Sequence, residues 1–213
     1  MNKAIILIIL GISNLLVSNP SNNKFQLSAL EQSHLLSTFS IFGEVRSPYG
    51  GIPTRSIKVQ LFLNGALFRE TNVDSGRFEF KDLPDDNKYE LIADVESQDN
   101  PLNGVSTADF VKIQRHLLGL VPFTQDYQRL AADVNQKNGA TVADLVEILK
   151  LILGTMDEFS SKKSWIIYPE KFYEEPNYKY YIKGSIYIDK SKSSISHNFT
   201  ILKLGDVNGS ATN

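Results

Sequence analysis

Two stretches of this chain read almost alike: residues 100–109 are NPLNGVSTAD and residues 135–144 are NQKNGATVAD. Both follow the string N-x-x-N-G-x-[S/T]-x-A-D, and each leads into apolar residues at helical spacing. The helical patterns end in LLG at residues 117–119 and in ILG at residues 152–154. Two copies in register indicate an internal repeat. Each copy is predicted to be a loop rich in oxygen donors that closes onto one helix.

The last residue of each string, Asp109 or Asp144, stands where the loop is predicted to become helix. A carboxylate at that point can cap the helix, and it can also bind a cation held in the loop. Asn-Gly pairs at 103–104 and 138–139 tolerate the positive φ that a tight ligand-wrapping turn needs. The wide apolar stripes of the two helices predict that the helices pack against each other.

The second copy has the spacing of a twelve-residue calcium loop when Asp133 is counted as position 1. Side-chain oxygen donors then fall at positions 1, 3, 9 and 12, and a backbone carbonyl falls at position 7. These positions hold Asp133, Asn135, Thr141, Asp144 and Gly139. The sequence therefore predicts a Ca²⁺ site with a dissociation constant of about 10⁻⁴ to 10⁻³ M, the range of extracellular modules. In the alternative, no calcium binds and the carboxylates only cap helices.

The first copy is a weaker candidate for calcium. With Asp109 at position 12, position 1 is Gln98 and position 5 is Leu102. Position 5 of the second loop is also unusual, because the charge of Lys137 opposes a cation. The candidate donors in the first copy are Asn100, Ser106 and Asp109, with either Asn103 or Asp99 as a further donor.

About residues 98–154 resemble a dockerin type I domain, whose two segments read D-x-N-x-[DN]-G-x-[IV]-[NST]-x-x-D-L-x-x-[LI]-[KR]-x-x-[LI]-L. The resemblance implies paired calcium loop-helix units, a cohesin-like protein partner and an assembly associated with polysaccharide breakdown. It also implies partner contacts at loop positions 10 and 11 and helix positions 17 and 18. These are Thr107, Ala108, Gln114, Arg115, Val142 and Lys150, with Ala143 and Leu149 more typical of packing.

Residues 39–97 show the period-2 alternation of short strands, as at Ile57, Val59 and Leu61. Asn64-Gly65 is a strong hairpin signal. Several such strands separated by turns predict a small antiparallel β-sandwich. The string DSGRFEFKDLP at residues 74–84 resembles the carboxypeptidase regulatory-like family, which implies a structural or spacing domain and no peptidase site.

The N-terminus has the pattern of a secretory signal peptide, with Lys3 followed by an apolar run from Ala4 to Val17. The run is shorter than the roughly 20 residues that span a bilayer. We expect a signal peptide at 1–22 and a linker at 23–38, and hence a secreted or cell-surface bacterial protein. A buried N-terminal helix or strand is the alternative.

Residues 157–213 are predicted to be a β-rich C-terminal segment. Its aromatic residues suggest either sugar stacking, as in a carbohydrate-binding adhesin, or strand core and loop cover. The aromatic residues are Trp165, Tyr168, Phe172, Tyr173, Tyr178, Tyr180, Tyr181 and Tyr187. The final GDVNGS resembles the opening of another calcium loop. Asp206 and Asn208 there either serve a cation, form an Asx turn, or begin a continuation of the protein.

Composition excludes several classes of function. The 213 residues contain no cysteine, so disulfides, thiolate metal sites and cysteine nucleophiles are ruled out. The net charge of −2 leaves no electrostatic footprint for nucleic acid. The common hydrolase and phosphate-binding motifs are missing, so we expect no enzyme. The predicted fold class is α+β: a β-sandwich at 39–97, a dockerin-like domain at 98–156, and the C-terminal segment.

Overall fold

Four of the first five strands alternate between buried and less buried side chains, as their sequence predicts, and the side chains of the strand at residues 66–72 are nearly all exposed. The computed structural model describes residues 38–53, 55–73, 75–96, 100–137, 139–170, 185–189 and 193–211. The five strands are β1 (Thr38–Arg46), β2 (Ile57–Leu63), β3 (Ala66–Asn72), β4 (Arg77–Pro84) and β5 (Lys88–Val95). Every second side chain of β5, from Tyr89 to Val95, is buried. Asn64 and Gly65 have the positive φ angles of a tight hairpin between β2 and β3.

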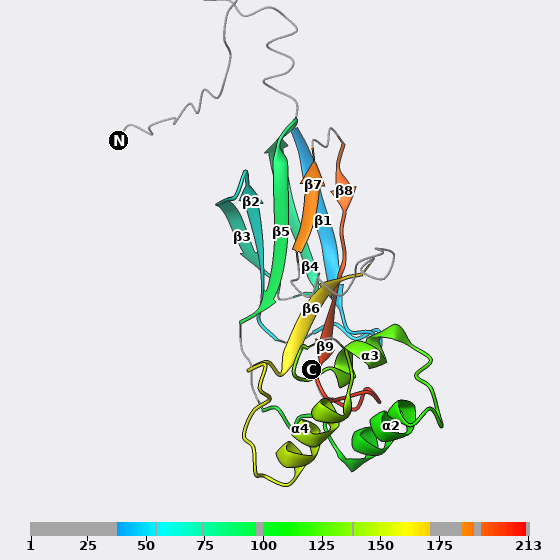
Figure 1. Ribbon diagram of the computed structural model, residues 1–213. Coiled ribbons are helices and arrows are strands. Elements are labelled where there is room, and N and C mark those ends of the chain that lie inside the picture. The colour runs from blue at the N-terminus through cyan, green and yellow to red at the C-terminus, as the bar shows by residue number, and fades with distance from the viewer. Residues whose placement is uncertain are drawn as a thin grey trace, which may run out of the picture. The chain divides into compact units, whose positions relative to one another are not determined.

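Four later strands complete the same two sheets. They are β6 (Trp165–Pro169), β7 (Ser185–Asp189), β8 (Ile195–Ser196) and β9 (Phe199–Lys203). One sheet has the order β4-β1-β9-β6, with β8 also paired to β1, and the other has the order β3-β2-β5-β7 (Figure 1). β1 runs parallel to β8 and β9, whereas the other pairs are antiparallel. A hydrophobic core fills the space between the sheets.

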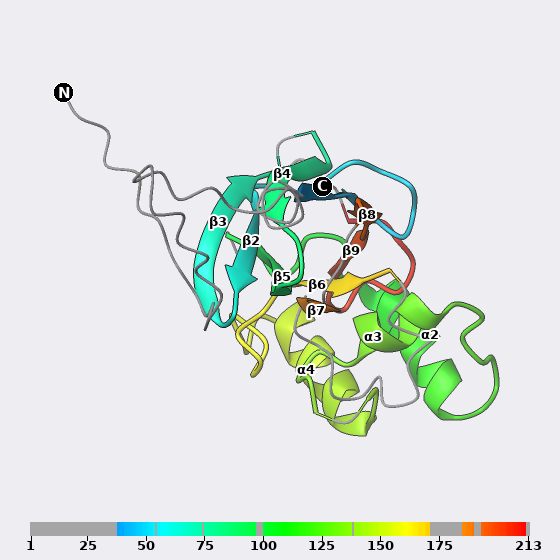
Figure 2. The same cartoon turned by 90° about the horizontal axis from the view of Figure 1, so that it is seen from above.

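Three short helices lie in the chain between β5 and β6: α2 (Thr107–Leu117), α3 (Asp126–Ala132) and α4 (Val142–Ile152). α2 and α4 occupy the two predicted helical segments and pack against each other. Glycines with positive φ follow both helices, at Gly119 and Gly154. Seen from above, the three helices gather on one side of the strands, next to β6 (Figure 2).

The helices rest on the outer side of β6 and β9 and form a second core with them. This arrangement explains the runs WIIY at 165–168 and ILKL at 201–204, which are apolar except for Lys203 and in which consecutive side chains are buried. A strand covered on both faces needs apolar residues at successive positions, whereas a strand with one wet face alternates. None of the helices in the described part of the chain is long and apolar enough to cross a membrane.

The predicted fold class is wrong. The described residues are mostly β, with nine strands in two sheets and only three short helices. The expected C-terminal β-rich segment is not separate, because β9 pairs with β1 and β7 pairs with β5. The expected pair of dockerin-like loop-helix units is not seen either. α3 stands between the two helices, and C-terminal residues complete the loop before α2.

Some predictions fall on residues that the structure does not describe. These are the signal peptide at 1–22, the linker up to residue 37, Gln98, Asp99, Asn138, and the rings of residues 172, 173, 178, 180 and 181. The described residues belong to one unit of the chain, Ser37–Asn213.

Candidate calcium loop and its counterpart

The loop before α4 is organised by a fully buried carboxylate, that of Asp144. Its Oδ2 accepts hydrogen bonds from the backbone N–H of Thr141 at 2.9 Å and from the Thr141 hydroxyl at 2.8 Å. Its Oδ1 accepts the backbone N–H of Asn135 at 3.0 Å. Asp144 thus caps α4 and also ties the helix to the start of the loop, nine residues earlier.

Asp133 closes the loop from its other end. Its Oδ1 accepts the N–H of Lys137 at 3.0 Å, and its Oδ2 accepts the N–H of Gly139 at 2.9 Å. Burial raises the pKa of the Asp133 carboxyl, the two N–H donors oppose that rise, and the charge of Asp144 adds to it. The Lys137 side chain is exposed, so this residue serves the loop through its backbone.

One buried polar atom of this loop differs from the others in its hydrogen bonding. The side-chain oxygen Oδ1 of Asn135 is buried and has no hydrogen-bond partner among the described residues. Asn135 itself is only 8% exposed, and its backbone N–H is held by Asp144. An unsatisfied buried acceptor destabilises a fold by about 1–3 kcal/mol, so native proteins nearly always give one a partner. The atom therefore marks a place for a donor or a cation.

Asp109 has the matching position at the start of α2 and is also fully buried. Its Oδ2 accepts the N–H of Ser106 at 3.1 Å and the Ser106 hydroxyl at 2.8 Å. Its Oδ1 accepts the N–H groups of Val207 and Asn208, and the Asn208 side-chain amide at 2.7 Å. Burial raises the pKa of Asp109, the Ser106 hydroxyl opposes the rise, and the charge of Asp206 adds to it.

The C-terminal residues after β9 supply the rest of the loop before α2. Asp206 is fully buried, and its Oδ1 accepts the N–H groups of Asn208, Gly209 and Ser210 at 2.7–3.2 Å. Its Oδ2 accepts the N–H of Ala211 at 2.7 Å. The Ser210 hydroxyl donates to the carbonyl of Gly104, which brings the segment back to the first copy.

The two loops share part of their hydrogen bonding. In each, the aspartate at the start of the helix accepts the N–H and the hydroxyl of the Ser or Thr three residues earlier, which pairs Asp109 and Ser106 with Asp144 and Thr141. Asp206 and Asn208 stand where Asp133 and Asn135 stand in the other loop, and Asp206 and Asp133 both accept the N–H four residues later. In each loop the N–H of the asparagine is donated to the helix-capping aspartate. The string DVN, which occurs at 133–135 and again at 206–208, is the sequence signal for this correspondence.

The predicted donors of the first copy are distributed differently. Ser106 contacts Asp109, as described above. Asn100 instead forms a turn, in which its Oδ1 accepts the N–H of Leu102 and its carbonyl accepts the N–H of Asn103. Within the described residues, no group of three or more His, Cys, Asp or Glu side chains gathers as a metal site.

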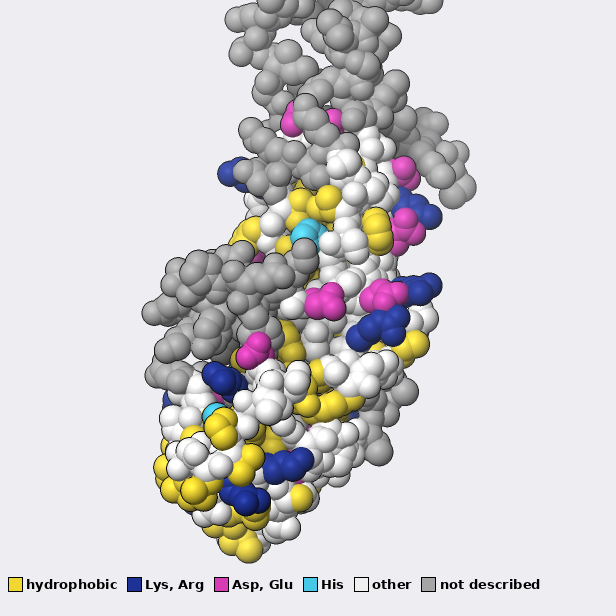
Figure 3. Space-filling view, turned by 90° about the vertical axis from the view of Figure 1, so that its right-hand side faces the viewer, with side chains coloured by type: hydrophobic (Ala, Val, Ile, Leu, Met, Phe, Trp, Pro, Cys, Tyr) yellow, Lys and Arg dark blue, Asp and Glu magenta, His cyan; other side chains and the backbone are white. Residues whose placement is uncertain are grey.

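The predicted partner-contact positions all lie on the surface. We call the exposed side of α2 and α4 the helical face. It carries matched apolar side chains at equivalent positions, Val111 with Val146 and Leu118 with Leu153. Hydrophobic side chains gather at this end of the molecule, with lysine and arginine among them (Figure 3). The exposed predicted contacts are Thr107, Ala108, Gln114, Arg115, Val142 and Lys150.

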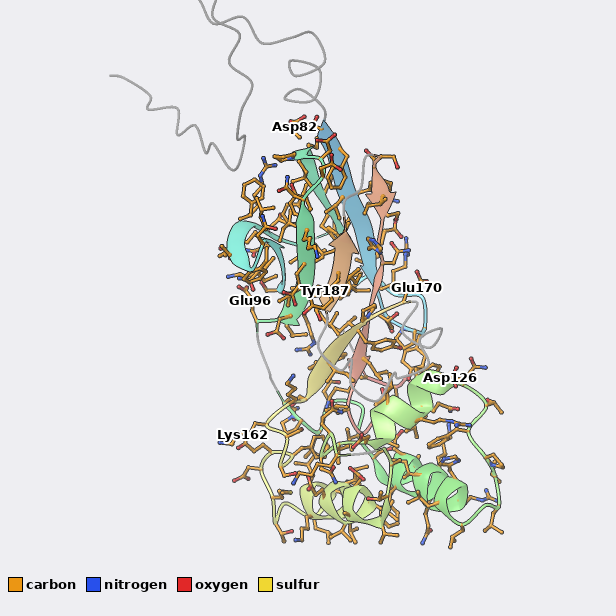
Figure 4. All side chains as sticks on the ribbon, turned by 45° about the horizontal axis from the view of Figure 1, so that its top comes forward. Asp82, Glu96, Asp126, Lys162, Glu170 and Tyr187 are labelled. Carbon is orange, nitrogen blue, oxygen red and sulfur yellow. The ribbon has the colours of Figure 1, made fainter. Side chains whose placement is uncertain are left out.

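The aromatic residues of the C-terminal part do not form a platform within the described residues. Trp165 and Tyr168 are buried, at 2% and 4% exposure. Tyr187, labelled on β7 in Figure 4, is 71% exposed. The burial of Trp165 and Tyr168 agrees with the second interpretation from the sequence, in which these rings belong to the core around the strands.

Comparisons with known proteins add little. No protein-family model matches the chain, and no curated protein matches it. Among solved structures, a chain described as a pilus-presented adhesin is similar with a TM-score of 0.31 and 7% identity. The match covers 78% of this chain and only 28% of the adhesin chain. A likeness of that size carries no argument about fold or function.

Proposed function

We propose that this protein is an exported, non-catalytic attachment module in which the loop from Asp133 to Asp144 binds Ca²⁺. The observation that carries the proposal is the orphaned Oδ1 of Asn135, buried in a loop that begins and ends with a buried carboxylate. A hard cation that prefers oxygen ligands would give this atom its partner.

The donor set suits calcium better than a transition metal. It consists of the Asp133 and Asp144 carboxylates, the amide oxygen of Asn135, the hydroxyl of Thr141 and the carbonyl of Gly139, and it contains no nitrogen or sulfur ligand. Calcium accepts six to eight such oxygens, water included, in flexible geometry. Two carboxylates give a modest local charge, which supports a dissociation constant of about 10⁻⁴ to 10⁻³ M.

We restrict the calcium proposal to this loop. In its counterpart, the side-chain amide of Asn208 donates to Asp109, so the positive end of the amide already faces the carboxylate. The Asp206 carboxylate is likewise surrounded by N–H donors of its own turn. Among the described residues of the counterpart, no buried side-chain oxygen is left without a hydrogen-bond partner, and this is the difference from the Asn135 oxygen.

The partner in this proposal is a protein of the cohesin type, bound at the helical face. Isolated exposed apolar residues are common, but several at equivalent positions of neighbouring helices favour a contact surface. Arg115 and Lys150 flank the apolar residues and favour a partner with acidic groups at its edge. Ion binding would order the loop that begins α4, which makes attachment calcium-dependent.

The test is thermal unfolding in a calcium titration. At ten times the dissociation constant, binding stabilises the native state by about 1.4 kcal/mol, which raises the melting temperature by roughly 3–6 °C. The variants Asp133→Ala and Asp144→Ala should lose this response. Asp126→Ala is the matched control, because Asp126 is an exposed first-turn carboxylate of α3, labelled in Figure 4. An equal calcium response in all four proteins would refute the proposal.

A further inference from the structure

The residues after β9 form a strap that is held from several sides. We call Asp206–Ala211 the strap. Its Gly209 packs so closely on Tyr49 that an added Cβ would lie 2.4 Å from the ring. The Tyr49 hydroxyl donates to the Asp206 carbonyl, and its ring meets that of Tyr127 edge-on at 5.1 Å. The strap therefore touches the loop between β1 and β2 and, through Tyr49, the helix α3.

The strap also holds the first copy of the repeat. Asp109 accepts three of its hydrogen bonds from Val207 and Asn208 of the strap. Gly104 leaves no room for a side chain, since an added Cβ would lie within 2.5 Å of Ala211. If the strap detaches, the buried Asp109 loses these donors. The Asp109 carboxylate then keeps the hydrogen bonds from Ser106.

The strap is joined to the other loop through the end of α3. Gly205, the residue before the strap, donates its N–H to the carbonyl of Ala131 at 2.7 Å. The Gln128 side chain donates to the Val207 carbonyl at 3.1 Å. Ala131 and Val134, on either side of Asp133, are fully buried. The strap therefore begins against α3, whose last residue immediately precedes Asp133.

We propose that calcium in the loop from Asp133 to Asp144 holds the strap on Asp109, so that one ion orders both copies of the repeat. This inference rests on the proposed calcium function. Binding requires Asp133 and Asn135 in their native positions, and these positions fix the end of α3. Any state in which α3 loosens releases the strap and loses the ion together. The coupling is reciprocal, so a weakened strap lowers calcium affinity by the same factor.

Hydrogen exchange of the strap amides tests the coupling. Saturating calcium should slow the exchange of Asn208, Gly209 and Ala211 about fivefold or more, the lower range of measured coupling. The edge strand β3 lies in the other sheet and is the internal control. Its amides should keep their rates, which separates a local effect from stabilisation of the whole fold.

Gln128→Glu is the uncoupling variant. The carboxylate keeps the oxygen that accepts the N–H groups of Thr124 and Gln125, and it loses the donor to Val207. We expect calcium to bind this variant more weakly, and its strap to gain less protection than in the unmodified protein. Asp126→Asn, at an exposed position of the same helix, should behave as the unmodified protein.

The outcomes separate the two proposals. If calorimetry shows calcium bound with unchanged exchange in the strap, the coupling is overturned and the calcium function stands. If calorimetry detects no binding up to about ten times the expected dissociation constant, both are overturned. Slower exchange in the strap and in β3 alike means general stabilisation, and it also overturns the coupling.

Discussion

The loop before α4 and the loop before α2 share one hydrogen-bond plan but are made from different pieces of chain. The first uses residues 133–144 in sequence. The second joins Ser106 and Asp109 to a strap almost a hundred residues later. In the continuous loop the Asn135 amide oxygen is buried and has no hydrogen-bond partner in the described part of the chain, whereas in the split loop the Asn208 amide nitrogen donates to Asp109.

The difference separates two ways to satisfy a buried carboxylate. In the split loop, N–H groups of the strap donate hydrogen bonds to Asp109. These bonds connect two distant parts of the chain. The continuous loop is closed by its own residues and needs no distant segment. Its buried Asn135 oxygen, next to two carboxylates, would suit a cation that prefers oxygen ligands. Under the proposed function, the duplication gives one copy a structural role and leaves calcium binding to the other.

The largest expected effect is the loss of the strap contact in Asp109→Ala. Five N–H or O–H donors from Ser106, Val207 and Asn208 would lose their acceptor. We expect a loss of about 3 kcal/mol in the free energy of unfolding, measured in urea. Asp109→Asn, which keeps one carbonyl oxygen, should lose less. A loss below about 0.5 kcal/mol, as at ordinary surface positions, would show that the strap does not depend on Asp109.

Asp144→Ala should have the next largest effect. Three donors from Asn135 and Thr141 lose their acceptor, so we expect a loss of about 2 kcal/mol without calcium. The stabilisation by calcium should disappear as well. In Asp109→Ala it should only decrease, because a weakened strap lowers calcium affinity without removing a ligand of the loop. Urea unfolding with and without 10 mM calcium, roughly ten times the weaker expected dissociation constant, separates these two losses. Undiminished calcium stabilisation of Asp144→Ala contradicts the assignment of the site.

Asn135→Leu should change stability in the opposite direction. Removing an unsatisfied buried acceptor leaves calcium-free stability unchanged or raises it by up to about 1 kcal/mol. The calcium response should nevertheless be lost. Asn135→Asp is the contrasting variant, with tighter calcium binding and lower stability without the ion. Chemical unfolding measures both, and a clear loss of stability in calcium-free Asn135→Leu would mean that the oxygen already has a partner.

The smallest effect concerns pH and the far end of α2. His116 accepts the Phe123 N–H through Nδ1 at 3.0 Å and stacks on its ring. Burial lowers the pKa of His116, and the charge of Arg129 adds to that effect. Because the folded pKa lies below the unfolded value, this stability is present above about pH 6.5 and is lost as pH falls through the folded value.

The equivalent residue in α4 is Leu151, which cannot titrate. His116→Leu should therefore flatten the pH dependence between pH 7.5 and 5. The difference should stay below about 1 kcal/mol, since the ring is only partly buried and solvent screens its charge. Urea unfolding at several pH values measures the slope. Parallel slopes for the two proteins would mean that His116 is protonated without cost.

Local features of the fold could be predicted from the sequence, and distant pairings could not. Alternation at Ile57, Val59 and Leu61 located β2, and the repeat located α2 and α4. The parallel pairing of β1 with β9 joins residues about 150 positions apart, and nothing local encodes it. The run WIIY at 165–168 signals a strand covered on both faces, yet its rings also suggested an aromatic surface.

In the candidate site, too, the contacts within one loop could be predicted from the sequence and the contacts between distant segments could not. Asp133, Asn135 and Asp144 lie within one loop, so their spacing predicted that they meet. Asp206 and Asn208 were recognised as the opening of a similar loop, but their partner was not, because the contact with Asp109 depends on where β9 ends. The orphaned oxygen of Asn135 depends on burial and side-chain orientation, which a spacing pattern does not contain.

The most direct test of the central claim is the ¹³C chemical shift of the Asn135 side-chain carbonyl during a calcium titration, with that of Asn208 as the reference. Ion binding to this oxygen predicts a large, saturable shift for Asn135 at about 10⁻⁴ to 10⁻³ M calcium and a much smaller one for Asn208. An Asn135 carbonyl whose shift stays constant in folded protein at several millimolar calcium, far above that range, would contradict the account.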